Sequence, residues 1–169
     1  MTDSEKIYSG LHLNLFLAGR PCVVIGGGKV AHHKIELLLE AGARVAVISP
    51  NVGAGVARLI ESGAITHTVR PFEPPDIDRA TLVYAATNSR AVNRQVLESC
   101  REKGVMCCCV DGNWAQSDFT TPATTPHNQL TVSVSSGGTD CRQSKMVKNS
   151  LARHLTMMGS ANLVVVGTD

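Results

Sequence analysis

The feature that most constrains this fold is the alternation of short apolar runs with segments of helical periodicity between residues 22 and 110. The runs are mostly apolar without interruption, which is typical of strands buried on both faces of a parallel sheet. They are residues 22–25, 45–48, 82–86 and 105–110, with a shorter alternating run at 65–69. The helical segments each end close to a glycine, and they are residues 30–41, 56–61 and 89–103. This order predicts an α/β fold with a Rossmann-like parallel sheet and crossover helices.

The chain changes in character after the last of these runs. Residues 111–128 are rich in Asp, Asn, Ser, Thr and Pro, which predicts a loop. The alternating run 130–135 predicts a strand, and 143–155 predicts a polar, basic helix. Residues 162–166 are a further candidate strand. We therefore expect the sheet to be followed by a small strand-and-helix C-terminal extension.

Composition and charge exclude several classes of function. Hydrophobic residues make up 43% of the chain, which is enough to build a core. No apolar run is long enough to span a bilayer, and the polar start of the chain lacks the pattern of a secretory signal. We therefore expect a cytoplasmic protein with no membrane partner. A net charge of +2 and an aromatic content of 4% argue against a nucleic-acid partner.

The cysteines raise the question of a disulfide framework or a metal site. They are Cys22, Cys100, Cys107, Cys108, Cys109 and Cys141. No two of them have the Cys-x-x-Cys spacing that is typical of zinc ligands. We predict buried or half-buried free thiols, which pack as small hydrophobes, and no metal site.

Residues 26–31, with the sequence GGGKVA, fit the pattern G-x-G-x-x-[G/A] between the first buried strand and the first helix. Gly26 allows the tight turn, Gly28 lets a pyrophosphate approach the backbone, and Ala31 lets the helix pack close to the sheet. The helix N-terminus would face the phosphates with its N–H groups and the positive end of its dipole. The pattern predicts a dinucleotide site, and the alternative is a glycine turn with only a packing role.

The position that usually distinguishes NAD from NADP carries no carboxylate here. An acidic residue after the second strand would bind both ribose hydroxyls, but the chain has Ser49, Pro50 and Asn51 there. Ser49 or Asn51 would bind the ribose more weakly, whereas Lys29 and Arg44 would favour a 2′-phosphate. The sequence by itself leaves NAD and NADP open.

Thr87 and Asn88 follow the predicted strand 82–86 at its carboxyl end. Open α/β sheets bind their ligands beyond this edge, so both residues are candidates for contacts to the ribose or the nicotinamide. The alternative is that Asn88 or Ser89 caps the following helix, and the two roles are compatible.

Several segments in one order resemble a single family. They are residues 15–20, 26–31, 37–43, 70–72, 85–88, 110–111 and 135–138. Together they resemble precorrin-2 dehydrogenase, the amino-terminal part of siroheme synthase, over about residues 10–155. The resemblance implies an NAD-dependent oxidoreductase that converts precorrin-2 to sirohydrochlorin in siroheme biosynthesis, a branch of porphyrin biosynthesis. In some members it also implies insertion of ferrous iron, the sirohydrochlorin ferrochelatase reaction.

The resemblance also assigns roles to individual residues. It assigns Asp111 to catalysis, Ser136 to the loop on the tetrapyrrole side, and the dinucleotide contacts to Lys29, Val30, Pro50 and Asn51. A carboxylate at the end of a buried strand can accept the proton that is lost during oxidation, or anchor a pyrrole N–H. The alternative for Asp111 is an Asx-turn, since the sequence Asp-Gly-Asn favours a turn.

A tetrapyrrole substrate with several carboxylates requires cations and loops rich in hydrogen-bond donors. The candidates for substrate binding are Ser135, Ser136, Gly137, Gly138, Arg142 and Lys145. The alternative for the two cations is an ordinary solvated helix face.

The resemblance weakens at residues 139–145, where the sequence TDCRQSK replaces the Ser-Pro and the apolar helix usual in the family. We expect an NAD-binding Rossmann-like domain over residues 1–112 and a shortened dimerisation and substrate-binding extension over residues 113–169. The resemblance implies a homodimer, with a separate chelatase as a further partner if the chain does not insert iron itself. The competing functions are metal insertion alone and a non-catalytic dinucleotide-sensing regulatory domain. The glycine loop argues against the first, and the missing acidic residue argues against the second.

Overall fold

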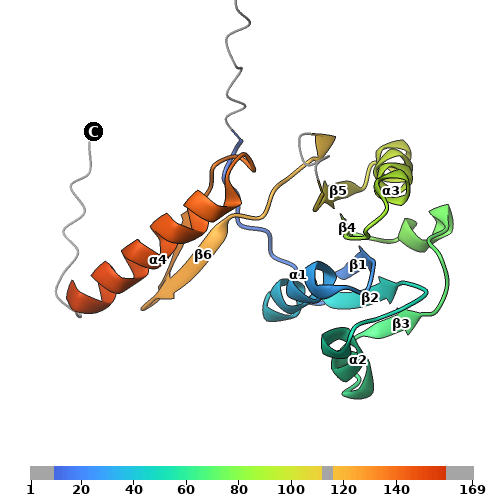
Figure 1. Cartoon of the computed structure of the whole chain (residues 1–169), viewed down its shortest axis with the longest axis horizontal. Coiled ribbons are helices and arrows are strands. Elements are labelled where there is room, and N and C mark those ends of the chain that lie inside the picture. The colour runs from blue at the N-terminus through green and yellow to red at the C-terminus, as the bar shows by residue number, and fades with distance from the viewer. Residues whose placement is uncertain (1–9, 112–115, 159–169) are drawn as a thin grey trace, which may run out of the picture. The chain divides into compact units, whose positions relative to one another are not determined.

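The computed structural model describes residues 10–111 and 116–158. It divides into two compact units, which are Gly10–Thr120 and a second unit that begins at Thr121 (Figure 1). No helix in the part of the chain that the structure describes has both the length and the apolar character needed to cross a membrane.

The first unit is built on a five-stranded sheet. The strands are β1 (Pro21–Ile25), β2 (Arg44–Ile48), β3 (Thr66–Thr68), β4 (Leu82–Ala85) and β5 (Met106–Cys109). Their order is β3-β2-β1-β4-β5, and every neighbouring pair is parallel. This is the Rossmann-like sheet that the alternating pattern predicts. The strand order reverses between β1 and β4, which makes their carboxyl ends the expected position of a ligand.

Helices cover both faces of this sheet. Helices α1 (Lys29–Glu40) and α2 (Ala54–Glu61) pack on one face, where Ile35 and Val56 meet Val24 of β1. Helix α3 (Arg90–Lys103) and the 3₁₀ helix η1 (Pro74–Ile77) pack on the other, where Val96 lies in one cluster with Val23. Because β1 has neighbours on both faces, its side chains are apolar without alternation. The structure thus confirms the prediction of fully buried strands.

The second unit contains a hairpin and a helix. Strands β6 (Ala123–His127) and β7 (Leu130–Val134) pair antiparallel, and α4 (Cys141–Met158) packs against them. The predicted strand at 130–135 and the predicted helix at 143–155 are confirmed, and the helix is longer than predicted. The candidate strand at 162–166 lies outside the described residues.

The prediction of a loop over residues 111–128 is wrong for 123–127, which form β6. Threonine and proline suggested a turn, but threonine also suits a strand, and proline is tolerated in a strand that has a partner on one side only. Asn128 takes a positive φ of 54° in the two-residue turn to β7. The pairing with β7 therefore stabilises an extended conformation that the local sequence does not indicate.

Candidate active site

The carboxyl ends of β1, β2, β4 and β5 lie along one edge of the parallel sheet. The segments that follow these strands carry most of the predicted site residues of the first unit. The glycine loop follows β1, residues 49–51 follow β2, Thr87 and Asn88 follow β4, and Asp111 comes two residues after the end of β5. The fold therefore gathers on one edge groups that are far apart in the sequence.

The first two glycines of the loop are held by close backbone contacts. Gly26 has a φ of +120°, and a Cβ atom there would lie 2.4 Å from the carbonyl oxygen of Ala86. A Cβ atom on Gly27 would lie 2.4 Å from the carbonyl oxygen of Asn51. The carbonyl of Gly27 also accepts a hydrogen bond of 2.9 Å from the N–H of Gly53. These contacts hold the loop between the segments that follow β2 and β4. The pattern does not indicate a role for Gly27, because this residue occupies one of its variable positions.

Gly28 differs from its two neighbours. A Cβ atom at this position would meet nothing within 4 Å, so the space in front of its Cα is open. Gly28 is the N-cap residue of α1, no side chain caps the helix, and the first turn holds no acidic residue. The N–H groups at this helix end can therefore meet an anionic ligand. This arrangement fits the phosphates of a dinucleotide.

The residues after Gly28 divide between solvent and core. Lys29 and Val30 are exposed on the first turn of α1, beside the open space. Ala31 is fully buried and lies in the core cluster with Val24 and Tyr84. A larger side chain at this position would push the helix away from the sheet. The structure thus places Ala31 where the pattern requires a small residue.

The segment after β2 presents some of the predicted ribose contacts more openly than others. The Ser49 side chain is buried and its hydroxyl donates a hydrogen bond of 2.7 Å to the carbonyl of Asn51. Pro50 and Asn51 are exposed. Arg44 begins β2 at the opposite edge of the sheet and donates to the carbonyl of Gly19 at 2.9 Å. The idea that Arg44 favours a 2′-phosphate is therefore wrong, because its strand carries it away from the glycine loop.

A hydrogen-bond network joins the segment after β4 to the one after β5. Ser89 is the N-cap of α3 and accepts from the N–H of Val92, so the capping alternative holds for Ser89 rather than for the exposed Asn88. The side chain of Asn93 accepts from the backbone N–H and the hydroxyl of Thr87 at 3.1 and 2.7 Å. Its NH₂ group donates to the carbonyl of Thr87 at 3.1 Å and to the carboxylate of Asp111 at 2.7 Å. Asn93 belongs to no sequence motif and was not predicted as a site residue; its only signal in the sequence is a polar side chain on the apolar face of a helix.

Asp111 itself is half-buried, and the strand before it is held on both sides. The N–H of Val110 donates to the carbonyl of Ala85 in β4 at 3.1 Å. On the other side, the N–H of Cys109 donates to the hydroxyl of Ser117 at 2.8 Å. These bonds fix the end of β5, and therefore the backbone from which the Asp111 side chain starts.

The cysteines are structural in character. Five of the six are buried, which confirms that prediction, whereas Cys141 is exposed. Hydrogen bonds with the thiols of Cys100 and Cys109, together with burial, raise the pKa of the Cys107 thiol. Burial also raises the pKa of Cys22. A raised pKa lowers the thiolate fraction and so the reactivity of these two thiols, whereas the hydrogen bond with Cys107 lowers the pKa of Cys109, which is protected by its burial. Within residues 10–111 and 116–158, no three His, Cys, Asp or Glu side chains are arranged to hold a metal ion.

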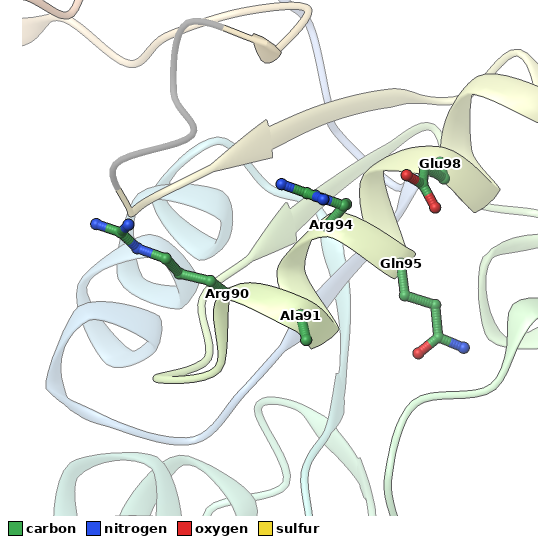
Figure 2. Close-up of a pocket in the computed structure, with 5 residues that line it drawn as sticks. All are labelled: Arg90, Ala91, Arg94, Gln95 and Glu98. Atoms are coloured by element: carbon green, nitrogen blue, oxygen red, sulfur yellow. The ribbon is translucent and has the colours of Figure 1, made fainter.

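A shallow hollow of about 350 Å³ lies on the outer face of α3, away from the buried face that carries Val96. It is lined by Arg90, Ala91, Arg94, Gln95 and Glu98 (Figure 2). Figure 2 shows Arg90 and Arg94 on one side of the helix and Gln95 on another. The hollow is formed by one helix face only and does not include the glycine loop or Asp111.

The serine–glycine loop of the second unit leads into α4. The hydroxyl oxygen of Ser135 accepts from the N–H of Gly137 at 3.0 Å, and that of Ser136 accepts from the N–H of Asp140 at 2.9 Å. Asp140 in turn accepts from the N–H of Gln143 at 2.8 Å and so caps α4. Both serine hydroxyls keep a proton to donate. Gly137 and Gly138 have positive φ values of 63° and 91°, and Arg142 and Lys145 are exposed on α4.

Comparisons with known proteins agree with this geometry. Residues 13–123 match the model of a family described as "Putative NAD(P)-binding". The siroheme synthase of Methylobacillus flagellatus is 37% identical over 135 residues, which are 80% of this chain and 29% of that protein. The siroheme synthase of Nitrosomonas europaea is 38% identical over 133 residues, which are 78% of this chain and 28% of that protein. The chain thus spans less than a third of the length of these relatives.

A solved structure, "SirC, precorrin-2 dehydrogenase", has the same fold. It aligns with a TM-score of 0.73 and 23% identity, and the match covers 86% of this chain and 71% of that one. The relatives confirm the resemblance to siroheme synthase, and the structural match confirms the fold. The family model takes in more than half of the chain, including the glycine loop, Asn93 and Asp111. The chain therefore belongs to the NAD(P)-binding family that this model describes.

Proposed function

We propose that this chain is an NAD-dependent oxidoreductase that oxidises precorrin-2 to sirohydrochlorin in siroheme biosynthesis. The observation that carries the proposal is the open space at Gly28 on the same sheet edge as the Asp111 carboxylate. This oxidation needs two things, a site for a hydride acceptor and a side chain that can take a proton. The siroheme synthase relatives support precorrin-2 as the substrate.

The cofactor role falls to the loops around Gly28. NAD, when bound, supplies the hydride acceptor. The backbone at Gly28 and the exposed first turn of α1 hold the pyrophosphate, with Lys29 and Val30 beside it. Asn51 and Pro50 bind on the ribose side, and Thr87 and Asn88 line the site at the end of β4. Two cations were considered for a 2′-phosphate, and Arg44 lies at the opposite edge of the sheet. Only Lys29 is left for that role, and the proposal places it beside the pyrophosphate, which favours NAD over NADP.

Asp111 is the catalytic residue of the proposal. Oxidation of the substrate removes a hydride and a proton, and the carboxylate accepts the proton. The hydrogen bond from Asn93 fixes one carboxylate oxygen, so the group meets its substrate in one orientation. If the chain also inserts ferrous iron, the same carboxylate can take protons from pyrrole nitrogens.

We assign substrate binding and dimerisation to the second unit. Ser135, Ser136, Gly137 and Gly138 offer hydroxyl and backbone N–H donors to substrate carboxylates, and Arg142 and Lys145 offer positive charge. Exposed apolar side chains on the hairpin and α4, Leu130 and Met146 among them, support a homodimer. We assign NAD binding to residues 1–112 and these two roles to residues 113–169, and we place the protein in the cytoplasm.

The test is anaerobic turnover of enzymatically made precorrin-2 with NAD, followed by the absorbance of NADH and of sirohydrochlorin. We expect turnover by the wild type and a fall of at least about a hundredfold in kcat for Asp111→Asn, the lower end of what a general base contributes. Asp78→Asn is the matched control, because Asp78 is exposed and pairs with Lys103 on the surface. NAD binding without binding or oxidation of precorrin-2 would contradict the proposal and leave a dinucleotide-sensing domain.

Two further measurements address the finer assignments. Substituting both Arg142 and Lys145 by Ala should raise KM for precorrin-2 with little change in the Kd of NAD, because both side chains are placed on the substrate. Arg58→Ala, an exposed cation of α2, is the control. Addition of ferrous ion to the product tests the ferrochelatase activity, and sedimentation tests the dimer.

A further inference from the structure

We infer that Asn93 is a positioning residue for the proposed oxidation: its amide fixes the Asp111 carboxylate relative to the loop after β4. The inference rests on the proposed function, since it gives Asn93 a role in the same reaction. Asn93 lies one turn into α3, where its N–H donates to the carbonyl of Ser89 at 3.0 Å. From there its side chain reaches both Thr87 and Asp111, which follow two different strands, β4 and β5.

The Asn93 side chain is fully buried in the core. Asn93 has no exposed surface, and the same face of α3 carries Val96, Leu97 and Cys100 in the core. A buried amide costs free energy unless its hydrogen bonds are made, so an apolar side chain would serve packing alone at lower cost. The hydrogen bonds of Asn93 therefore account for the presence of a polar group here.

The hydrogen bonds of Asn93 use the full capacity of its amide. The oxygen accepts two bonds, from the N–H and the hydroxyl of Thr87. The nitrogen has two protons and donates one to the carbonyl of Thr87 and the other to Asp111. Because a backbone N–H can only donate, Thr87 fixes which end of the amide is the oxygen, and this aims the nitrogen at the carboxylate.

The two partners of Asn93 lie on either side of the proposed reaction. Thr87 lies in the loop that follows β4, which the proposal places beside the cofactor, and Asp111 supplies the proton acceptor. One rigid side chain thus sets the separation between the loop at the cofactor and the carboxylate. The carbonyl of Asn93 also accepts from the thiol of Cys109 at 3.7 Å, which ties the same turn of α3 to β5.

The test is a double-mutant cycle on kcat with Asn93→Ala and Asp111→Asn. If Asn93 acts through the carboxylate, Asn93→Ala lowers kcat at least tenfold in the wild-type background and less than twofold in the Asp111→Asn background. A merely structural residue would give the same factor in both. Ser99→Ala is the matched control, because Ser99 is a second buried polar residue of α3. It should lower the melting temperature without lowering kcat.

A pair of exchanged residues covers the case in which Asn93→Ala does not fold. Asn93→Asp sets two carboxylates against each other and should lower the melting temperature. Adding Asp111→Asn restores an amide–carboxylate bond in the reverse direction, so the melting temperature should recover in part while kcat stays at the level of Asp111→Asn alone. Recovery is partial because a carboxylate at position 93 cannot donate to the carbonyl of Thr87. Equal losses of kcat in both backgrounds, or no recovery in the exchanged pair, would refute the role of Asn93 alone. Absence of turnover by the wild type would instead refute the proposed function, and the inference with it.

Discussion

The glycine loop allows stability and cofactor binding to be separated by substituting two adjacent residues with alanine. At Gly28, the backbone has a φ of −81° and a ψ of −171°, which alanine adopts without strain. A methyl group there meets no atom of the protein within 4 Å. At Gly27, the same methyl group would lie 2.4 Å from the carbonyl oxygen of Asn51 and 2.9 Å from the Cα of Val52.

The expected changes in stability follow from these contacts. Replacing glycine by alanine reduces the entropy of the unfolded chain, which stabilises the fold by about 0.4–1 kcal/mol. Alanine is a poorer N-cap than glycine by roughly 1 kcal/mol, so at Gly28 the two effects nearly cancel. At Gly27 the clash is with backbone atoms and should cost about 1–3 kcal/mol or more. For a chain of this size, that corresponds to a melting temperature lower by roughly 3–10 °C.

NAD binding should respond to the substitution at Gly28, which leaves stability nearly unchanged. The methyl group of Gly28→Ala occupies the space that the proposal gives to the pyrophosphate, and it prevents close approach to the backbone. Loss of one hydrogen bond to a charged group, about 1.5–3 kcal/mol, would weaken NAD binding by roughly ten- to a hundredfold.

The assay combines thermal unfolding, followed by circular dichroism, with calorimetric titration of NAD at a temperature where both variants are folded. We expect Gly28→Ala to melt within about 3 °C of the wild type and to bind NAD at least tenfold more weakly. Wild-type affinity in a folded Gly28→Ala variant would refute the assignment of the pyrophosphate to this space. A Gly27→Ala variant as stable as the wild type would refute the packing argument.

Three further predictions concern the thiols, the packing of α1 and the ion pair at η1. Under native conditions a thiol reagent should modify one cysteine, Cys141, because it is exposed and the other five thiols are buried; rapid labelling of several thiols before unfolding would contradict this. Ala31→Leu should lower the melting temperature by roughly 3–10 °C, because small-to-large changes in a packed core cost about 1–3 kcal/mol, and unchanged melting would show that α1 is not packed closely on the sheet. Partial burial opposes ionisation of Asp76, but its hydrogen bonds with Arg70 at 2.5 and 2.9 Å hold the pKa of Asp76 below its usual value. Asp76→Asn should therefore destabilise the fold above about pH 3.9, the pKa expected in the unfolded chain, and the difference should vanish as the pH falls through the lower folded-state value; a difference that grows in acid would contradict the pairing.

The parts of the site that could be predicted are those with a local signature. The glycine loop follows from a spacing of small residues between a strand and a helix, and Asp111 from its place at the end of a buried strand together with the family resemblance. The sequence does not predict that the Ser49 hydroxyl is used within its own loop, where it donates to the carbonyl of Asn51. The pairing of Arg70 with Asp76 in η1 likewise leaves no local signature in the sequence.

The sequence by itself determined the order of strands and helices in the first unit and the position of the dinucleotide loop. Both depend on apolar periodicity and on glycine, which act over a few neighbouring residues. The tertiary structure decided what depends on partners far away in the chain. The β6 strand needs β7, and the restriction at Gly27 comes from Asn51. Asn93 gains its role only when the fold brings it to the carboxylate that it holds, which lies 18 residues away in the sequence. Contacts of this kind leave no local pattern, since each partner is compatible with many other environments until the sheet brings the two together.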